Sequence, residues 1–268
     1  RFLDHLVEYF FEKTEPLHKD LTHLIVEEKL NAQLEKTFST YRKTTKIIAP
    51  LDEINFIHTS LVLEGNTLTL PETELVIQKG IPPGTKMMRD AQQVLDYKNA
   101  LDQFLHSTEA ISLENVLSFH RTAMNTLKRG AGMIRKQNVK IKDNPNFTTP
   151  DWHLVPKLLD ELFEKIDEMN REKKKSAVQI VEEASFLHNE FQRIHPFVDG
   201  NSRTARALFA KYVLQHGFSL VGIAVGFMDQ YMNLTKLSEK RDDKKFGILM
   251  KQITLLSLQN AIQRLELE

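Results

Sequence analysis

The chain has 268 residues, which is enough to bury a sizeable core in one or two domains. Its 36 acidic and 36 basic residues balance, which argues against a general nucleic-acid binder. It has no cysteine, so disulfides and cysteine-ligated zinc are excluded, and no apolar run approaches the roughly 20 residues of a membrane span. We expect a cytoplasmic protein without nucleic-acid or membrane partners. Because the chain starts at Arg1, export or a removed targeting segment stays open.

The N-terminal region is predicted to be helical. Residues 1–48 place apolar side chains at helical spacing, with a break at Pro16, and are interpreted as a packing scaffold. A further helix is predicted over residues 52–64, with Asp52 as its N-cap and Gly65 as its stop.

The middle of the chain combines helices with one short hairpin. Apolar residues recur at three- and four-residue intervals over residues 88–106 and 113–124, which predicts two helices. His120 lies on the apolar side of the second and is interpreted as a packed histidine. Residues 135–142 alternate between apolar and polar side chains, which indicates a strand, and residues 147–149 are its candidate partner.

The residues that can perform chemistry gather between two further predicted helices. The first starts near Ala177 and ends before Pro196, because proline disfavours helical geometry in the preceding residue. The second runs from Ser202 to Gly217. The residues between them favour a turn, so backbone N–H groups and a helix N-terminus should converge where an anion can bind.

The side chains in this turn suit phosphate chemistry. A histidine ordinarily has a near-neutral pKa, so His195 is a candidate to take a proton from a hydroxyl group. Asp199 can hold Mg²⁺, which usually takes one or two protein carboxylates and completes its shell with water and phosphate oxygens. Arg203 and Arg206 lie on one side of the first helical turn, and their planar guanidinium groups match phosphate oxygens. Each piece alone is commonly structural, but together they indicate a metal-bound polyphosphate beside a general base.

The run from His195 to Arg206 resembles the signature loop of the Fic (filamentation-induced-by-cAMP) family, His-x-Phe-x-Asp/Glu-Gly-Asn-Gly-Arg-x-x-Arg. It departs at Ser202, where the family usually has glycine. The resemblance implies a mainly α, multi-helix Fic fold with a small β-hairpin flap over the active site. It divides the chain into an N-terminal helical region (1–95) and a catalytic core (96–268). The matching positions are His195, Phe197, Asp199, Gly200, Asn201, Arg203 and Arg206.

Members of that family most often transfer AMP from ATP to a hydroxyl of a target protein, so ATP, Mg²⁺ and a protein target are implied here. His195 would deprotonate the Ser, Thr or Tyr hydroxyl, and Asp199 would hold the metal. The flap would accept the target segment by backbone pairing at Val139, Lys140, Ile141 and Lys142. The implied ATP-binding residues are Gly200, Asn201, Ser202, Arg203, Thr204 and Arg206, with Tyr231 near the adenine.

A second resemblance concerns Glu64, which spacing alone assigns to a solvated surface. The segment from Ser60 to Asn66 resembles the family's inhibitory motif, Ser/Thr-x-x-x-Glu-Gly/Asn-Asn. It implies that Ser60, Glu64 and Asn66 belong to an inhibitory helix, residues 52–64, in which Glu64 pairs with Arg206 and blocks the γ-phosphate of ATP. Self-association to a homodimer through the N-terminal region is expected on the same basis.

Three alternatives stay open. Glu64 can instead activate water for the removal of AMP, or the enzyme can transfer a different phosphate-containing group. The third alternative is a non-catalytic helical interaction module that keeps a relic of the loop. The intact His195, Asp199 and both arginines speak against the third.

Overall fold

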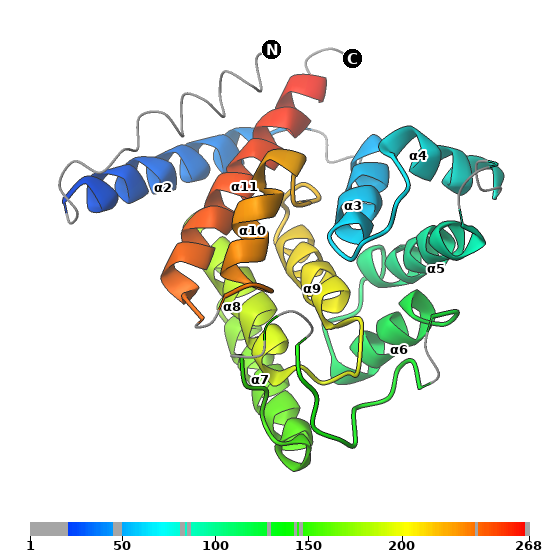
Figure 1. Ribbon diagram of the computed structural model, residues 1–268. Coiled ribbons are helices and arrows are strands. Elements are labelled where there is room, and N and C mark those ends of the chain that lie inside the picture. Colours follow the sequence, from blue (N-terminus) through cyan, green and yellow to red (C-terminus); the bar gives the residue numbers. More distant parts are fainter. Residues whose placement is uncertain are drawn as a thin grey trace.

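The structure is a computed structural model that describes residues 21–44, 50–80, 84, 87–127, 130–141, 144, 147–238 and 241–265. It is mainly helical, as the sequence predicts (Figure 1). None of the helices it describes is both long and apolar enough to cross a lipid bilayer. The α-helices are α2 (Leu21–Tyr41), α3 (Pro50–Val62), α4 (Leu70–Lys79), α5 (Met88–Leu105), α6 (Leu113–Ala123), α7 (Val155–Arg171), α8 (Ala177–Ile194), α9 (Asn201–Gln215), α10 (Met228–Leu234) and α11 (Asp243–Leu265), and two 3₁₀ turns, η1 (Trp152–Leu154) and η2 (Val225–Phe227), precede α7 and α10.

Helix α9 lies at the centre of the fold, in contact with α8, α5, α6 and α3 (Figure 1). Every residue from Arg203 to Val213 is buried, and a helix buried on all sides belongs inside a protein. Helix α11 packs against both α8 and α2, and one hydrophobic cluster runs through all these helices. The first turn of α9 therefore starts inside the protein, which fixes the residues that it carries.

The predicted domain boundary between residues 95 and 96 falls inside α5. This helix is continuous from Met88 to Leu105 and contacts α3 and α4 as well as α6 and α9. Its buried residues on both sides of the boundary belong to the same hydrophobic cluster. The division into 1–95 and 96–268 stays an interpretation of the sequence. Of the predicted N-terminal helical scaffold, residues 1–20 and 45–48 lie outside the described residues.

Helix α3 begins earlier than the sequence predicts. It starts at Pro50, so Asp52 lies within its first turn and the prediction of Asp52 as N-cap is wrong. Proline is tolerated at the start of a helix because N–H groups there have no intrahelical acceptor. The Asp52 carboxylate instead forms an ion pair with Arg264 of α11 at 2.6 Å.

The end of α3 is set by Gly65, as predicted. The helix stops at Val62, and Gly65 has φ 88°, a left-handed conformation that glycine adopts without a steric cost. The N–H of Gly65 donates to the Val62 carbonyl at 2.9 Å, and that of Asn66 to the Leu61 carbonyl at 3.0 Å. Glu64 therefore lies in the turn that follows the helix.

The predicted β-hairpin is not confirmed, since no strand forms among the described residues and Ile141 makes a single isolated antiparallel bridge with Asn144. Polar groups of this segment bond to other parts of the chain. The Asn144 side chain donates to the carbonyls of Lys236 and Ser238, at 3.0 and 2.6 Å. These bonds attach Asn144 to the loop after α10.

The four positions expected to dock a target segment lie in and around this irregular stretch. Val139 and Lys140 have no regular secondary structure, and the Val139 carbonyl accepts from Thr149 Oγ1 at 2.8 Å. Ile141 forms the isolated bridge, and Lys142 lies outside the described residues. Target docking here stays a prediction.

Candidate active site

The end of α8 delivers His195 in an unusual backbone conformation. His195 has φ 51° and ψ 58°, and among the residues that the structure describes it is the one non-glycine residue with positive φ. Its N–H donates to the Phe191 carbonyl at 3.0 Å, and the following Pro196 prevents the helix from continuing. A left-handed conformation costs about 1–2 kcal/mol for a residue with a Cβ, so the surroundings must hold it.

Arg135 provides much of that support. It is 2% exposed, and its guanidinium group donates Nε–H to the His195 carbonyl at 2.8 Å and Nη2–H to the Pro150 carbonyl at 2.6 Å. Its backbone N–H donates to the Pro196 carbonyl at 2.8 Å. A cation at this end of α8 also complements the negative end of the helix dipole. This role of Arg135 could not be predicted from the sequence, because an arginine inside a predicted strand carries no signal for it.

The turn after His195 is ordered by its own side chains. Asn201 Oδ1 accepts from the Phe197 N–H and Asn201 Nδ2 donates to the Phe197 carbonyl, both at 2.9 Å. Thr204 is 1% exposed, and its hydroxyl donates to the Gly200 carbonyl at 2.9 Å. Its predicted contact with ATP stays a prediction. Helix α9 thus begins at Asn201 with the N–H groups of its first turn outside the intrahelical bonding pattern.

His120 supports the same turn from α6. The Gly132 N–H donates to His120 Nδ1 at 2.8 Å, so Nε2 carries the proton and donates to the Asp199 carbonyl at 2.8 Å. The ring stacks on Phe197 with centroids 3.6 Å apart. Burial lowers the pKa of His120 to about 4, which keeps the ring neutral. The interpretation of His120 as a packed histidine is confirmed.

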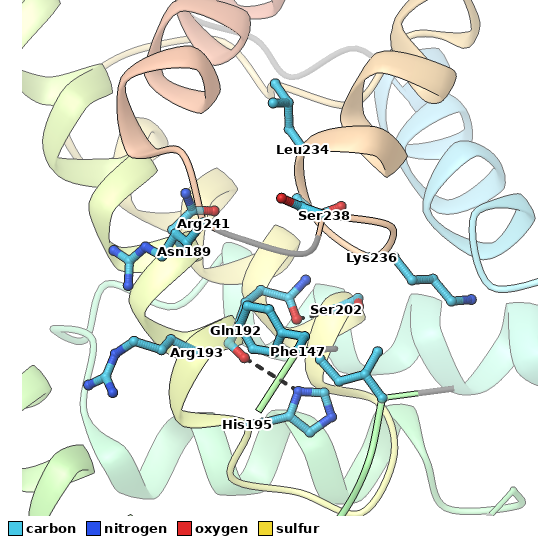
Figure 2. Close-up of a pocket in the computed structure, with 12 residues that line it drawn as sticks. Phe147, Asn189, Gln192, Arg193, His195, Ser202, Leu234, Lys236, Ser238 and Arg241 are labelled. Carbon is cyan, nitrogen blue, oxygen red and sulfur yellow. Dashed lines mark hydrogen bonds between the residues drawn. The ribbon is translucent and has the colours of Figure 1, made fainter. Parts of the chain in front are cut away.

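His195 and Ser202 open onto a pocket between α8, the residues Ile141 and Phe147, and the loop after α10 (Figure 2). The pocket contains about 480 Å³ of empty space, part of it open to solvent. Its remaining walls are formed by Ile141, Phe147, Asn189, Gln192, Arg193, Leu234, Thr235, Lys236, Ser238 and Arg241.

The His195 ring is set up as a proton acceptor. Its Nδ1 lies 3.4 Å from the Gln192 carbonyl, which can only accept, so Nδ1 is the protonated nitrogen and Nε2 keeps its lone pair. Burial lowers the pKa of His195 to about 4. The imidazole is therefore neutral at physiological pH.

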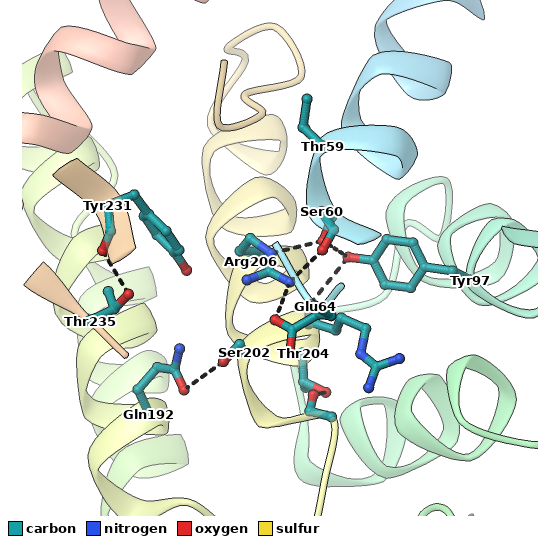
Figure 3. A network of polar contacts seen from close by, with 12 residues as sticks. Thr59, Ser60, Glu64, Tyr97, Gln192, Ser202, Thr204, Arg206, Tyr231 and Thr235 are labelled. Atoms are coloured by element: carbon teal, nitrogen blue, oxygen red, sulfur yellow. Dashed lines mark hydrogen bonds and ion pairs between the residues drawn. The ribbon is translucent and has the colours of Figure 1, made fainter. Parts of the chain in front are cut away.

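Arg206 and Glu64 meet as the resemblance implies (Figure 3). Arg206 Nη2 donates to Glu64 Oε1 at 2.8 Å and to the Ser60 carbonyl at 2.8 Å, while Nε donates to Ser60 Oγ at 2.8 Å. The Arg206 side chain is 3% exposed and that of Glu64 19%. Asn66 fixes the turn after Glu64, because its Nδ2 donates to the Asp90 carbonyl at 3.0 Å.

The other arginine of this helix, Arg203, lies about one turn before Arg206. Arg203 Nη2 approaches Asp199 Oδ1 at 3.4 Å, and Arg203 Nε is buried without a hydrogen-bond partner in the described part of the chain. The Asp199 side chain is 39% exposed, and its Oδ1 also accepts from the Gly200 N–H at 2.7 Å. Two buried guanidinium groups and one accessible carboxylate thus surround the first turn of α9.

Tyr231 is a buried neighbour of Arg206. It is 1% exposed, its hydroxyl is 2.7 Å from His188 Nε2, and the Arg206 guanidinium is 5.9 Å from the centre of its ring. It does not line the pocket onto which His195 opens, and its contact with adenine stays a prediction.

Tyr97 was not predicted from the sequence as a residue of the site, and its hydroxyl lies 2.9 Å from Ser60 Oγ. Only the fold brings these two residues together.

Residues 110–213, which include α6 and the turn from α8 to α9, match the model of the Fic/DOC family. The chain carries a Fic domain. Protein adenylyltransferase fic-1 of Caenorhabditis briggsae is 28% identical over 208 residues, which are 74% of this chain and 39% of that protein.

Solved structures share the fold of this chain. A segment of Fic-1 from C. elegans superimposes with a TM-score of 0.77 at 22% identity, covering 91% of this chain and 75% of that one. A Fic domain-containing signalling protein from Bacteroides thetaiotaomicron gives 0.73 at 20% identity, covering 89% and 97%. The chain spans less than half the length of the curated relatives it matches.

The turn leaves no room for a side chain at Gly200, so Gly200→Ala should destabilise the protein. Gly200 has φ 83°, and an added Cβ would lie 2.8 Å from Met124 Sδ and 2.9 Å from His120 Nε2. We expect a loss of about 2–4 kcal/mol in the free energy of unfolding, measured by urea denaturation. Gly247→Ala in α11 is the control, because its Cβ would meet nothing within 4 Å. An equal effect of both changes would contradict this account.

Acid should destabilise the fold through its buried histidines. Burial lowers the pKa of His120 and His195 to about 4 and that of His188 to about 3, below the ordinary 6.5 of the unfolded chain. Their stabilising contribution is therefore present above pH 6.5 and is lost as the pH falls toward 4 and 3. Urea denaturation across this range measures the loss. Histidine NMR signals that all titrate near pH 6.5 would contradict it.

Proposed function

We propose that this Fic domain is a protein adenylyltransferase, which transfers AMP from ATP to a Ser, Thr or Tyr hydroxyl of a target protein. The observation that carries the proposal is the turn itself. It combines a neutral His195, the N-terminus of α9 and two buried arginines beside an open pocket. The names of the curated relatives, protein adenylyltransferases, support the same reaction.

In the proposed reaction the target hydroxyl oxygen attacks the α-phosphorus of ATP. A new P–O bond forms, the bond from the α-phosphorus to the bridging oxygen of the β-phosphate breaks, and pyrophosphate leaves. His195 Nε2 takes the hydroxyl proton, which its Nδ1–H bond to the Gln192 carbonyl prepares it to do. N–H groups of the first turn of α9, with Arg203 and Arg206, stabilise the phosphate charge. Most of the rate comes from positioning and fixed charges, because no covalent enzyme intermediate is needed.

Asp199 is the residue that would hold Mg²⁺. A single accessible carboxylate fits this ion, which completes its coordination with water and phosphate oxygens. Mg²⁺ would neutralise part of the phosphate charge. The N–H group of Gly200 and the guanidinium of Arg203 hold the Asp199 carboxylate in place.

We further propose that Glu64 inhibits the transfer. Its carboxylate pairs with Arg206 at 2.8 Å in a largely buried setting, where charges interact more strongly than in water. A phosphate group that used Arg206 would have to displace this carboxylate or lie next to a like charge. Nucleotide would then bind in an unproductive position, and the basal activity would be low.

Removal of AMP is a second candidate, because the same carboxylate lies at the site and is 19% exposed. In this reaction Glu64 takes a proton from water, and the water oxygen bonds to the phosphorus of the modified target. The bond from the phosphorus to the target oxygen breaks, and that oxygen leaves as a hydroxyl with a proton taken up from the solvent. Incubation of AMP-modified target with Mg²⁺ and without ATP distinguishes the two directions. Loss of the label there would favour removal as the main activity.

Glu64→Gly should raise transfer at least tenfold, because it removes the carboxylate that competes with phosphate for Arg206. The measurement is incorporation of labelled ATP into lysate proteins or into the chain itself, followed by mass spectrometry of the labelled band. His195→Ala in the same background should lose at least 100-fold, the contribution expected of a general base. Equal labelling by wild type and Glu64→Gly would count against inhibition. Full labelling after His195→Ala would refute the assigned mechanism.

A further inference from the structure

Arg206 is held by a buried chain of hydrogen bonds that does not include Glu64. We propose that Tyr97, acting through Ser60, is a positioning residue that keeps Arg206 aligned for phosphate binding, and that this role is separate from inhibition by Glu64. The inference rests on the proposed function, since it concerns the same arginine. It gives the last turn of α3 and the middle of α5 a positive role in nucleotide binding.

The direction of each hydrogen bond follows from the groups involved (Figure 3). Arg206 Nε can only donate, so Ser60 Oγ is the acceptor in their 2.8 Å bond. The Arg203 carbonyl can only accept, so the Tyr97 hydroxyl donates to it, at 3.3 Å. The remaining 2.9 Å bond between Ser60 and Tyr97 must then have Ser60 as donor. The chain runs from Arg206 through Ser60 and Tyr97 to the backbone of α9 itself.

This relay, made of Arg206, Ser60, Tyr97 and the Arg203 carbonyl, is shielded from water. Tyr97 is 0% exposed and Ser60 2%. The Tyr97 ring stacks parallel to Phe56 and meets Phe119 edge-on, with centroids 6.4 and 5.9 Å away. Burial raises the pKa of Tyr97, which keeps its hydroxyl protonated. A fully satisfied polar network in a dry setting is rigid, because each broken bond leaves an unpaired buried group.

Glu64 accepts fewer hydrogen bonds from Arg206 than Ser60 does. Ser60 accepts from Nε through its hydroxyl and from Nη2 through its carbonyl, whereas Glu64 accepts from Nη2 alone. Removal of the Glu64 carboxylate therefore leaves the guanidinium plane fixed by two bonds to α3. Removal of the Ser60 or Tyr97 hydroxyl leaves Arg206 with fewer constraints, and a flexible arginine loses more entropy when it binds phosphate.

The test compares hydroxyl deletions in the Glu64→Gly background, where inhibition is absent. Tyr97→Phe and Ser60→Ala should each weaken Mg²⁺–ATP binding about five- to tenfold by calorimetry. Combined, they should lose little more than the stronger one, because both act through one arginine. The matched control is Thr59→Val, since the neighbouring Thr59 hydroxyl donates only within α3, to the carbonyls of Asn55 at 2.9 Å and Phe56 at 3.5 Å. It should leave the affinity unchanged.

A second readout does not depend on nucleotide. The Arg206 Nε–H proton should exchange with water faster after Tyr97→Phe than in the Glu64→Gly parent, followed by NMR. Unchanged affinity and unchanged exchange in the Tyr97→Phe and Ser60→Ala variants would overturn the inference while the proposed function stands. If the Glu64→Gly parent itself failed to bind Mg²⁺–ATP, the proposed function and this inference would fall together.

Discussion

The backbone path from His195 to Gly200 is the constraint on which the rest of the site depends. Two left-handed residues bracket this turn, and one of them is a histidine whose conformation is unfavourable in isolation. The turn persists because Arg135, His120 and Asn201 satisfy its carbonyl and N–H groups from three sides. The same path aims the His195 ring at the pocket and starts α9 beside it. The positions of the groups proposed to be catalytic are thus fixed by backbone hydrogen bonding in the absence of a ligand.

The burial of α9 explains why two arginines here can act as fixed charges. On a surface, long cationic side chains would sample many conformations and be screened by solvent. Arg203 and Arg206 are 5% and 4% exposed, so their positions are set by protein neighbours. Such charges require compensation, which Glu64 and Asp199 provide in this structure. In the proposed reaction a triphosphate with Mg²⁺ would take over that compensation. The proposed inhibition and the proposed substrate binding would then both depend on the need to neutralise these two arginines.

The sequence alone was sufficient for the local features and for one long-range contact. The periodicity placed α5, α8 and α9 correctly, and Gly65 marked the end of α3. The contact between Glu64 and Arg206, 142 residues apart, could be expected only because two motifs resembled those of one family. The hydrogen bonds between Asn201 and Phe197 are local, since both residues lie within one turn.

Other features depended on partners that no local pattern reveals. Arg135 contacts His195, which lies 60 positions away in the sequence, and Tyr97 contacts Ser60, which lies 37 positions away. The sequence on either side of Arg135 and Tyr97 therefore gives no sign of these contacts. The hairpin is not confirmed: alternation indicated a strand, but the Asn144 side chain bonds to the loop after α10. The start of α3 was misplaced because Asp52 resembled a cap, although Pro50 already begins the helix and Asp52 pairs with Arg264.

The central claim is that one turn between α8 and α9 receives the phosphates of a nucleotide. Backbone amide NMR of the Glu64→Gly protein during titration with Mg²⁺–ATP tests it most directly. The account predicts the largest shifts at residues 200–203, together with the His195 ring signals and the Arg206 side-chain N–H. Shifts confined to other parts of the chain, with these signals unmoved at saturation, would contradict it.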